Sequence, residues 1–472
     1  MSDKNNNFLV CPCCRITLSL DDRGDLSCPS CAGRYPFEEG ILVMGEKNYF
    51  YSTITRGVLR DCLDRIDRSG WNEGVHNFLR QNEPGTYRYA VSPTRADWHF
   101  LFRLNRKMNV LDYGCGFGAI TEQLSRFAGK VYSLDATWES LQFVSRRKQS
   151  RGLDNVFPIY LERGSRLPFP DDSLDLVCLN GVLEWVGKSI TSQSPRQAQL
   201  NVLKEINRVL KPSGSVYIGI ENRVGLCYFL GWVDDHSGLR WTTILPRKLA
   251  SIISRMKKGE EYRTYTYSVP GYRRLLRSAG FPAPEFFAAI PNYRKPGNIV
   301  PLKAKNCYRS FLRRRISYLK KELGLAGVIR HWLMDLINYL KFPFLVNSLG
   351  MSARKSGKME KYLNGLVRKE GGFGLPGITE ETSWKFYSHS TTAWGKYGKV
   401  IFWGFPDNKK NPLIVAKIMR LPEFNYSLDK SRENLNFIRT SNSSLNEFVP
   451  EPLFLGARGG YRVFVEKAIP GS

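Results

Sequence analysis

The chain has 472 residues, of which 42% are hydrophobic, and it carries a formal net charge of +27 at pH 7. This length predicts two to four domains, and no stretch approaches the ~20 apolar residues of a transmembrane helix. The first seven residues lack the apolar core of a secretion signal, so we expect a cytoplasmic protein. The positive charge favours nucleic acid or an anionic membrane as partner, although it also promotes solubility.

Two C-x-x-C pairs lie near the start of the chain. Cys11 and Cys14 form the first pair, and Cys28 and Cys31 form the second, with 13 residues between them. Two such pairs can supply four thiolates to one closed, structural Zn²⁺ site. We expect these four residues to be the ligands and Cys13 to be a bystander, unless it exchanges with Cys14. A redox-active dithiol is the alternative, and the lack of a βαβ pattern around the pairs argues against it.

A small zinc ribbon is expected over residues 1–45. Leu18, Leu20 and Leu26 suit a hairpin between the pairs, and residues 35–41 suit a closing strand. Zinc can fold so small a unit, because its binding to such peptides is worth ~10–16 kcal/mol. The remaining cysteines stand singly, as in a protein from a reducing compartment; they are Cys62, Cys115, Cys178, Cys227 and Cys307.

The most informative stretch is residues 110–118, Val-Leu-Asp-Tyr-Gly-Cys-Gly-Phe-Gly. An apolar run ends at Asp112, glycines follow at alternate positions, and residues 119–127 have a helical pattern. A second strand-like run ends at Asp135. Glycines let backbone approach a ligand, a helix start offers free N–H groups, and an acid after the next strand can bind ribose hydroxyls. The spacing differs from the Gly-x-Gly-x-x-Gly of NAD(P) sites.

The pattern Asp-x-Gly-x-Gly-x-Gly resembles motif I of the class I S-adenosylmethionine (SAM) methyltransferases. Residues 167–177 (LPFPDDSLDLV) resemble the family's entry to its fourth strand, and residues 180–186 follow it. Residues 202–221 resemble its next helix, Lys-Pro turn and fifth strand. The resemblance covers about Trp98 to Phe287. It implies an α/β fold with a doubly wound, Rossmann-like sheet of seven strands over residues 70–357, and SAM as the cofactor.

The resemblance also assigns residues to the cofactor. The loop would hold the aminoacyl end of SAM through Asp112, Gly114, Gly116 and Gly118. Asp135 would take the ribose hydroxyls. Leu179 and Asn180 would lie beside the transferred methyl group. Many relatives have an acid four residues before the motif's Leu167, whereas this chain has Arg163 there and Glu162 one step earlier, which leaves the adenine contacts open. The cysteine-rich segment resembles the small zinc ribbons that accompany methyltransferases.

Three residues are candidates for the catalytic base. His236 follows the fifth strand, where ligand sites of open α/β sheets lie, and the neighbouring Asp235 could orient it. Glu184 and Glu221 are the competing candidates. A loop histidine without a role is the alternative for His236. Methylation of an amine or a carboxylate needs no strong base.

Residues 262–272 and 292–294 are rich in tyrosine and arginine, which suit sugars, phosphates or flat rings at a pocket mouth. A strand with one buried face is the alternative. Together with neighbouring motifs, these segments resemble methyltransferases associated with bacterial surface polysaccharides. The resemblance implies a glycan-type acceptor, including a lipid-linked one.

A basic, amphipathic helical insertion is expected at about residues 303–341. Leucines recur there at helical spacing, and Arg313, Arg314 and Arg315 form a cationic cluster. Such a segment can lie on an anionic membrane, which would place the protein at the inner membrane face. A helical lid over the active site is the alternative. Residues 344–354 are expected to be the seventh strand.

The carboxyl-terminal part reads as a linker over residues 358–382, followed by a second unit over residues 380–472. Residues 413–419 resemble the third strand of a kinase-type small lobe, with Lys417 in the phosphate-binding position and Glu433 as its helix partner. Later strands resemble the sugar- and choline-phosphotransferase group. No large lobe follows before Ser472, so we expect an incomplete kinase-like lobe without phosphoryl transfer of its own.

These features predict a SAM-dependent methyltransferase that acts on a hydroxyl or amine of a small-molecule or glycan-type acceptor. The alternative is an RNA methyltransferase, which the charge and the ribbon would suit. A second alternative is a non-catalytic adaptor. The intact glycine loop and Asp135 argue against the adaptor.

Overall fold

The computed structural model describes residues 8–314, 345–357, 361–391, 398–407 and 409–469. A mixed sheet forms its centre, in the strand order β11-β13-β10-β9-β6-β7-β8. The five strands from β10 to β8 are parallel, and β13 and β11 run antiparallel to their neighbours. The predicted α/β sheet with a parallel centre is confirmed. The bounds are β6 (Asn109–Tyr113), β7 (Lys130–Asp135), β8 (Val156–Leu161), β9 (Leu174–Asn180), β10 (Leu210–Glu221), β11 (Glu285–Asn292) and β13 (Ser348–Arg354).

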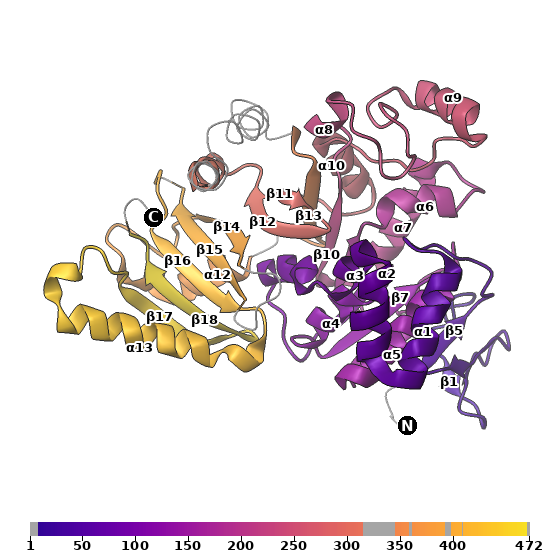
Figure 1. Ribbon diagram of the computed structural model, residues 1–472, viewed down its shortest axis with the longest axis horizontal. Helices are drawn as coiled ribbons and strands as arrows, with labels where there is room; N and C mark the ends of the chain where they lie inside the picture. The colour runs from indigo at the N-terminus through magenta and orange to yellow at the C-terminus, as the bar shows by residue number, and fades with distance from the viewer. Residues whose placement is uncertain (1–7, 315–344, 358–360, 392–397, 408, 470–472) are drawn as a thin grey trace.

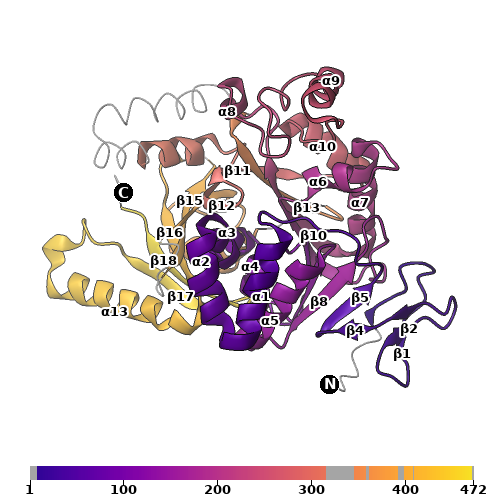
Figure 2. The same cartoon turned by 45° about the vertical axis from the view of Figure 1, so that its right-hand side comes forward.

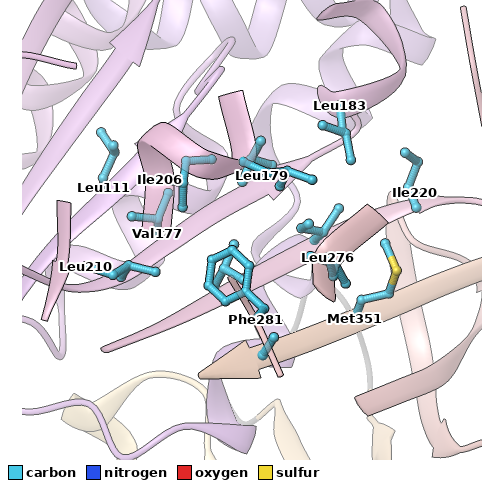
Figure 3. Packing of buried hydrophobic residues seen from close by; sticks show 14 of the residues in the cluster. Leu111, Val177, Leu179, Leu183, Ile206, Leu210, Ile220, Leu276, Phe281 and Met351 are labelled. Carbon is cyan, nitrogen blue, oxygen red and sulfur yellow. The ribbon is translucent and has the colours of Figure 1, made fainter. Parts of the chain in front are cut away.

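Helices cover both faces of this sheet (Figure 1). Successive side chains of a strand point to opposite faces, so Leu111 and Val177 join one core, while Val110 and Leu176 join the other. Ile206 and Leu276, from helices α7 and α10, complete the first core (Figure 3). Helices α4 and α5 contribute to the second. These helices are α4 (Ala119–Ser125), α5 (Trp138–Arg151), α6 (Leu183–Ser189), α7 (Pro195–Val209) and α10 (Val269–Ser278).

Local signals fix where these helices begin and end. Ser194 caps α7 by accepting a hydrogen bond from the Gln197 N–H, and Pro195 stands at the first helical position. Gly152 ends α5 in a left-handed conformation with φ of 61°. The start of α7 and the end of α5 are therefore marked by residues typical of helix ends.

The amino-terminal cysteines lie in turns beside a separate three-stranded sheet of β1 (Ser19–Leu20), β2 (Leu26–Ser27) and β3 (Arg34–Tyr35). This sheet projects from the body at the lower right of Figure 2. The next strands, β4 (Phe37–Glu38) and β5 (Ile41–Met44), join the large sheet, because β5 pairs in parallel with β8. The segment expected as a ribbon over residues 1–45 therefore divides between two sheets.

A helical segment over the cofactor side precedes β6. It consists of α1 (Arg56–Trp71), the π-helix η2 (Asn72–Leu79), α2 (Arg80–Asn82), α3 (Pro84–Val91) and the 3₁₀ segment η3 (Pro93–Leu101). Cys62 and Leu63 of α1 are buried, as is Phe143 of α5, and they share one apolar cluster. This packing fixes the segment against the sheet.

The carboxyl-terminal strands extend the same sheet rather than forming an independent unit. Strand β12 (Lys295–Pro301) pairs with β14, and the order continues β15-β16-β18-β17. The remaining elements are β14 (Trp384–Ser390), β15 (Lys399–Pro406), β16 (Ile414–Met419), β17 (Pro452–Arg458), β18 (Tyr461–Lys467), α12 (Tyr362–Lys369), α13 (Tyr426–Ser441), η5 (Gly371–Gly374), η6 (Pro422–Phe424) and η7 (Ser443–Leu445).

Two expectations about this region are wrong. In the segment expected as a linker over residues 358–382, the described residues 361–382 are no free linker, because α12 buries Tyr362 and Leu366 in the core that the carboxyl-terminal strands share with the central sheet. Lys417 does not pair with Glu433. Its Nζ lies 2.7 Å from Glu466 on the adjacent strand, and Glu433 is exposed on α13. Strands β16 and β18 are adjacent in the sheet, so Lys417 and Glu466 are neighbours.

The basic insertion lies mostly outside the described residues. Residues 305–314 are helical, and Leu312 is buried, while the segment from Arg315 to residue 344 is outside the described range. Arg314 lies over the ring of Trp403, with its guanidinium carbon 4.2 Å from the ring centre. Among the described helices, none is both long and apolar enough to cross a membrane.

Candidate active site

A pocket opens at the carboxyl ends of β6, β7 and β9. It is walled by the glycine loop on one side and by residues from the amino-terminal segment on the other. Its lining includes Tyr51, Tyr89, Tyr113, Gly114, Gly116, Phe117, Asp135, Ala136, Thr137, Glu162, Arg163, Asn180, Gly181, Val182 and Trp185. The position agrees with the rule that open α/β sheets bind ligands beyond the carboxyl ends of their strands.

The glycine loop needs its glycines for conformation and for space. Gly114, Gly116 and Gly118 have φ values of 74°, 51° and 73°, which residues with a Cβ rarely adopt. A Cβ on Gly114 would also lie 2.5 Å from a methyl of Val182. Gly114 and Gly116 line the pocket, whereas Gly118 begins α4 behind it.

Asp135 ties the loop to the next strand. Its Oδ2 accepts a hydrogen bond from the Gly116 N–H at 2.9 Å, and its Oδ1 accepts one from the Thr137 N–H at 2.9 Å. Burial raises the pKa of this carboxyl, although backbone hydrogen bonds counter the effect. The carboxylate lies on the pocket wall, where the sequence placed the ribose hydroxyls.

Asp112, expected at the aminoacyl end of SAM, lies behind the loop. Its Oδ2 accepts a hydrogen bond from the Thr121 hydroxyl at 2.7 Å, and its Oδ1 accepts one from the Cys178 thiol at 3.3 Å. Leu179 is likewise buried in the sheet core rather than on the pocket wall. Neither residue lines the pocket.

Asn180 reaches the pocket. Its side chain is 5% exposed, and neither the amide oxygen nor the amide nitrogen has a hydrogen-bond partner among the described residues. Unpaired buried amide groups are costly, so they indicate a missing polar ligand. The glycine cradle, the Asp135 carboxylate and this amide together fit the aminoacyl and ribose groups of SAM.

The three candidate bases meet beside this pocket. Glu184 comes from α6, Glu221 ends β10, and His236 lies in the loop between α8 (Leu226–Phe229) and α9 (Arg247–Lys258). The His236 Nε2 lies 3.4 Å from Glu221 Oε2 and 3.5 Å from Glu184 Oε1. Their exposed fractions are 0% for Glu184, 6% for Glu221 and 8% for His236. The sequence named all three residues as competitors, and the structure makes them one cluster.

The partner that orients His236 is Asp234 rather than Asp235. Asp234 Oδ1 lies 2.9 Å from His236 Nδ1, and its Oδ2 accepts a hydrogen bond from the Ser237 hydroxyl at 2.8 Å. Asp235 is exposed and pairs with Arg294 at 3.2 Å. The turn from Asp234 to Ser237 folds the first acid inward, which the sequence alone did not indicate.

The cluster strongly perturbs its own protonation. Burial, and then the charge of Glu184, raise the pKa of Glu221 to about 7. Burial lowers the pKa of His236, but the hydrogen bond with Asp234 and the contacts with Glu184 and Glu221 outweigh it and raise that pKa to about 11. Strongly perturbed groups beside a cleft are typical of functional sites.

Aromatic residues connect the cluster with the pocket. The ring of Trp185 lines the pocket and meets the His236 ring edge-on, with centres 5.1 Å apart. The ring centre of Tyr51 lies 4.5 Å from that of Trp185, and both residues line the pocket. The hydroxyl of Tyr293 lies 3.5 Å from Glu184 Oε1 and beside pocket-lining Gly181. Sequence reasoning missed Tyr51 and Trp185, because no motif marks them.

Comparison with known proteins decides the class. Residues 111–218 match the family model described as a methyltransferase domain. The ubiquinone biosynthesis O-methyltransferase of Rickettsia akari is 26% identical over 205 residues, which are 43% of this chain and 74% of that relative. The chain is a SAM-dependent methyltransferase.

The comparisons also found a second curated relative and similar solved structures. The demethylmenaquinone methyltransferase of Geobacillus stearothermophilus is 36% identical to this chain over 154 residues, which are 32% of this chain and 60% of that relative. A SAM-dependent methyltransferase structure from Aquifex aeolicus shares 20% identity and a TM-score of 0.26, and covers 37% of this chain and 83% of its own.

The fold of this chain also brings its paired cysteines together. Cys11 Sγ lies 3.5 Å from Cys31 Sγ, and Cys14 Sγ lies 3.2 Å from Cys28 Sγ. All four sulfurs lie within 4.8 Å of one another, and Cys13 stays exposed outside the group. Sulfurs about 2.3 Å from a tetrahedral zinc lie about 3.8 Å apart, so the donor set fits zinc.

Proposed function

We propose that the methyltransferase transfers the methyl group of SAM to a hydroxyl oxygen of a lipophilic small molecule. The observation that carries the proposal is the buried pair Glu184 and Glu221 beside the cofactor pocket. One carboxylate oxygen of each has no hydrogen-bond partner among the described residues. A hydroxyl must lose its proton as it is methylated, whereas a neutral amine need not, so two poised acceptors favour oxygen over nitrogen.

The chain's own residues divide the task. When bound, SAM supplies a methyl group on a cationic sulfur. Gly114, Gly116 and Asp135 hold the cofactor, and the Asn180 amide faces the space between cofactor and cluster. The cluster accepts the proton, and Trp185 closes the wall between the two, so that acceptor and cofactor meet in a fixed orientation.

The acceptor is proposed to be a ring hydroxyl on an apolar molecule. Tyr51, Tyr89 and Trp185 give the pocket an aromatic wall, which suits a flat ring. The relatives named above act in ubiquinone biosynthesis and on demethylmenaquinone, and these names do not support the predicted glycan acceptor.

An exposed apolar surface next to the cluster supports a membrane source for this acceptor. It consists of side chains from α8, α9 and the loop between them: Phe229, Leu230, Trp232, Val233, Trp241, Leu249, Ile252 and Met256. Both helices lie at the upper end of the molecule in Figures 1 and 2. Surfaces with this many large apolar side chains mark interaction sites.

Basic residues of α9 beside this apolar surface favour an anionic bilayer as its partner. Helix α9 has five basic residues and no acid, and its two buried residues, Ala250 and Ser254, are small. Its outer face therefore combines apolar and cationic side chains, as in helices that lie on anionic bilayers. His236 lies in the same loop as Trp232 and Trp241, which places the cluster close in the chain to this surface. A structural zinc at the four cysteines completes the proposal.

The test is methyl transfer from labelled SAM to four acceptor classes. Vesicles carrying polyprenylated phenols should be methylated, whereas the matched aniline analogues, lipid-linked sugars and tRNA should not. Mass spectrometry of the product locates the methyl group. Methylation of tRNA, the competing function, or of the aniline alone would overturn the assignment.

A further inference from the structure

We propose that Glu184, Glu221 and His236 bind one divalent metal ion. This inference rests on the proposed function, because the ion would act on the acceptor hydroxyl. The three side chains offer ligand atoms within 4.8 Å of one another. Each is more than nine-tenths buried, and each presents an atom without a hydrogen-bond partner: Glu184 Oε2, Glu221 Oε2 and His236 Nε2.

The distances fit shared coordination better than hydrogen bonding. The His236 Nε2 lies 3.4 Å and 3.5 Å from the two carboxylates, beyond the ~2.9 Å typical of a charged N–H···O bond. Ligand atoms about 2.1 Å from a tetrahedral metal lie about 3.4 Å from one another. The cluster is therefore spaced as ligands around an ion, with a coordination position left for substrate or water.

A second shell orients the histidine. Asp234 lies 2.9 Å from His236 Nδ1, which fixes the tautomer that presents Nε2 to the carboxylates. Asp234 is in turn held by the Ser237 hydroxyl. A carboxylate–histidine pair of this kind accompanies most histidine metal ligands. Asp234 Oδ1 also accepts a hydrogen bond from the His236 backbone N–H at 3.1 Å, so the turn itself holds the acid beside the imidazole.

The charge balance also calls for a cation. Glu184, Glu221 and Asp234 place three acidic side chains around one imidazole, all of them buried. Arg294 approaches Glu221 only at 3.5 Å, and its side chain is 42% exposed. The imidazole of His236 and the half-exposed guanidinium of Arg294 are the positive groups that contact these three acids within the described residues. A divalent ion in place of the Nε2 proton would add positive charge between the two glutamates.

The donor set separates this site from the cysteine site. One imidazole nitrogen and two carboxylate oxygens suit Mn²⁺, Fe²⁺ or Zn²⁺, whereas four thiolates select a softer zinc site. The bound ion would lower the pKa of an acceptor hydroxyl beside it. The proton passes to a free carboxylate oxygen, the hydroxyl oxygen forms the new bond to the methyl carbon, and the electrons of the carbon–sulfur bond return to sulfur.

Mn²⁺ titration of the full-length protein, followed by electron paramagnetic resonance, tests the site without reference to activity. The wild type should bind one equivalent. Glu184→Gln and Glu221→Gln should each weaken binding at least ten-fold, and Asp234→Asn about 10- to 100-fold. Glu260→Gln, a change at an exposed surface acid, should leave it unchanged. Circular dichroism and SAM calorimetry on the same samples report whether the fold and the cofactor pocket persist.

Two outcomes would overturn the inference. One is no Mn²⁺ binding by a wild type that binds SAM. The other is equal Mn²⁺ affinity in the wild type and the folded Glu184→Gln and Glu221→Gln variants. In either case, loss of methyl transfer in those variants would leave the carboxylates as proton acceptors alone, so the proposed function survives independently.

Discussion

The ring of Trp185, which lines the pocket, contacts the ring of His236 in the buried cluster. The indole meets the imidazole edge-on, with ring centres 5.1 Å apart. Helix α6 places Trp185 directly after Glu184, so one turn of helix supplies both the wall and one member of the cluster. A shift of this turn would disturb cofactor and acceptor together.

Loss of the Asp135 carboxylate should weaken SAM binding. Asp135→Ala removes the acceptor for the Gly116 N–H and the expected acceptor for the ribose hydroxyls. Hydrogen bonds to a charged group contribute ~1.5–3 kcal/mol, so affinity should fall about 10- to 100-fold by calorimetry. Asp154→Ala, at an exposed loop acid, is the matched control. Unchanged affinity in Asp135→Ala would remove Asp135 from the cofactor site.

The carboxyl-terminal strands should depend on one buried ion pair. Arg420, from the end of β16, contacts Asp97 through two bonds of 2.9 Å, and both side chains are 2% exposed. Removing one partner of a buried pair typically costs ~3–5 kcal/mol, so Arg420→Met should lower the unfolding temperature markedly. Lys188→Met breaks an exposed pair and should change stability by less than ~1 kcal/mol. Equal effects of the two changes would show that Arg420 contributes no more than a surface charge.

The four clustered cysteines should hold one zinc. Cys28→Ser should lose one equivalent of zinc by elemental analysis and should expose residues 9–35 to protease, because the ribbon has little core of its own. Cys13→Ser should retain the metal. SAM affinity should stay the same in both variants. Full zinc content in Cys28→Ser, or a disulfide among these cysteines in the wild type, would contradict the assignment.

The apolar surface should bind anionic vesicles. Replacing Lys248, Lys257 and Lys258 with glutamine should weaken binding to vesicles rich in phosphatidylserine, since each basic residue near such a surface contributes ~1 kcal/mol. Added salt should weaken wild-type binding in the same way. Trp232→Ser should lower binding to anionic vesicles at high salt as well, because its contribution is apolar. Indifference of the wild type to these vesicles would leave the surface without this role.

The sequence predicted best what depends on local spacing. The turn at Gly114 and the acid after the next strand lie within a short segment, so their geometry follows from neighbouring residues. The sequence predicted Glu184, Glu221 and His236 as alternative catalytic bases and not as one cluster. Their common place at the end of the sheet does not specify which side chains touch.

Long-range features were harder to predict. Strand β5 joins the central sheet through β8, more than 100 residues later, and no local signal marks that pairing. The burial of α12 depends on Tyr461 and its neighbours near the end of the chain. A Gly-rich, charged composition suggested a linker, whereas tertiary packing made it part of the core.

The central claim is that buried carboxylates beside the SAM pocket promote methylation of a hydroxyl. The most direct measurement is single-turnover methyl transfer to a polyprenylated phenol by the wild type, Glu221→Gln and Glu260→Gln, with SAM affinity measured in parallel. We predict that Glu221→Gln slows methyl transfer about 10²- to 10⁴-fold with SAM affinity unchanged, and that Glu260→Gln matches the wild type. Wild-type rates in Glu221→Gln would contradict the account.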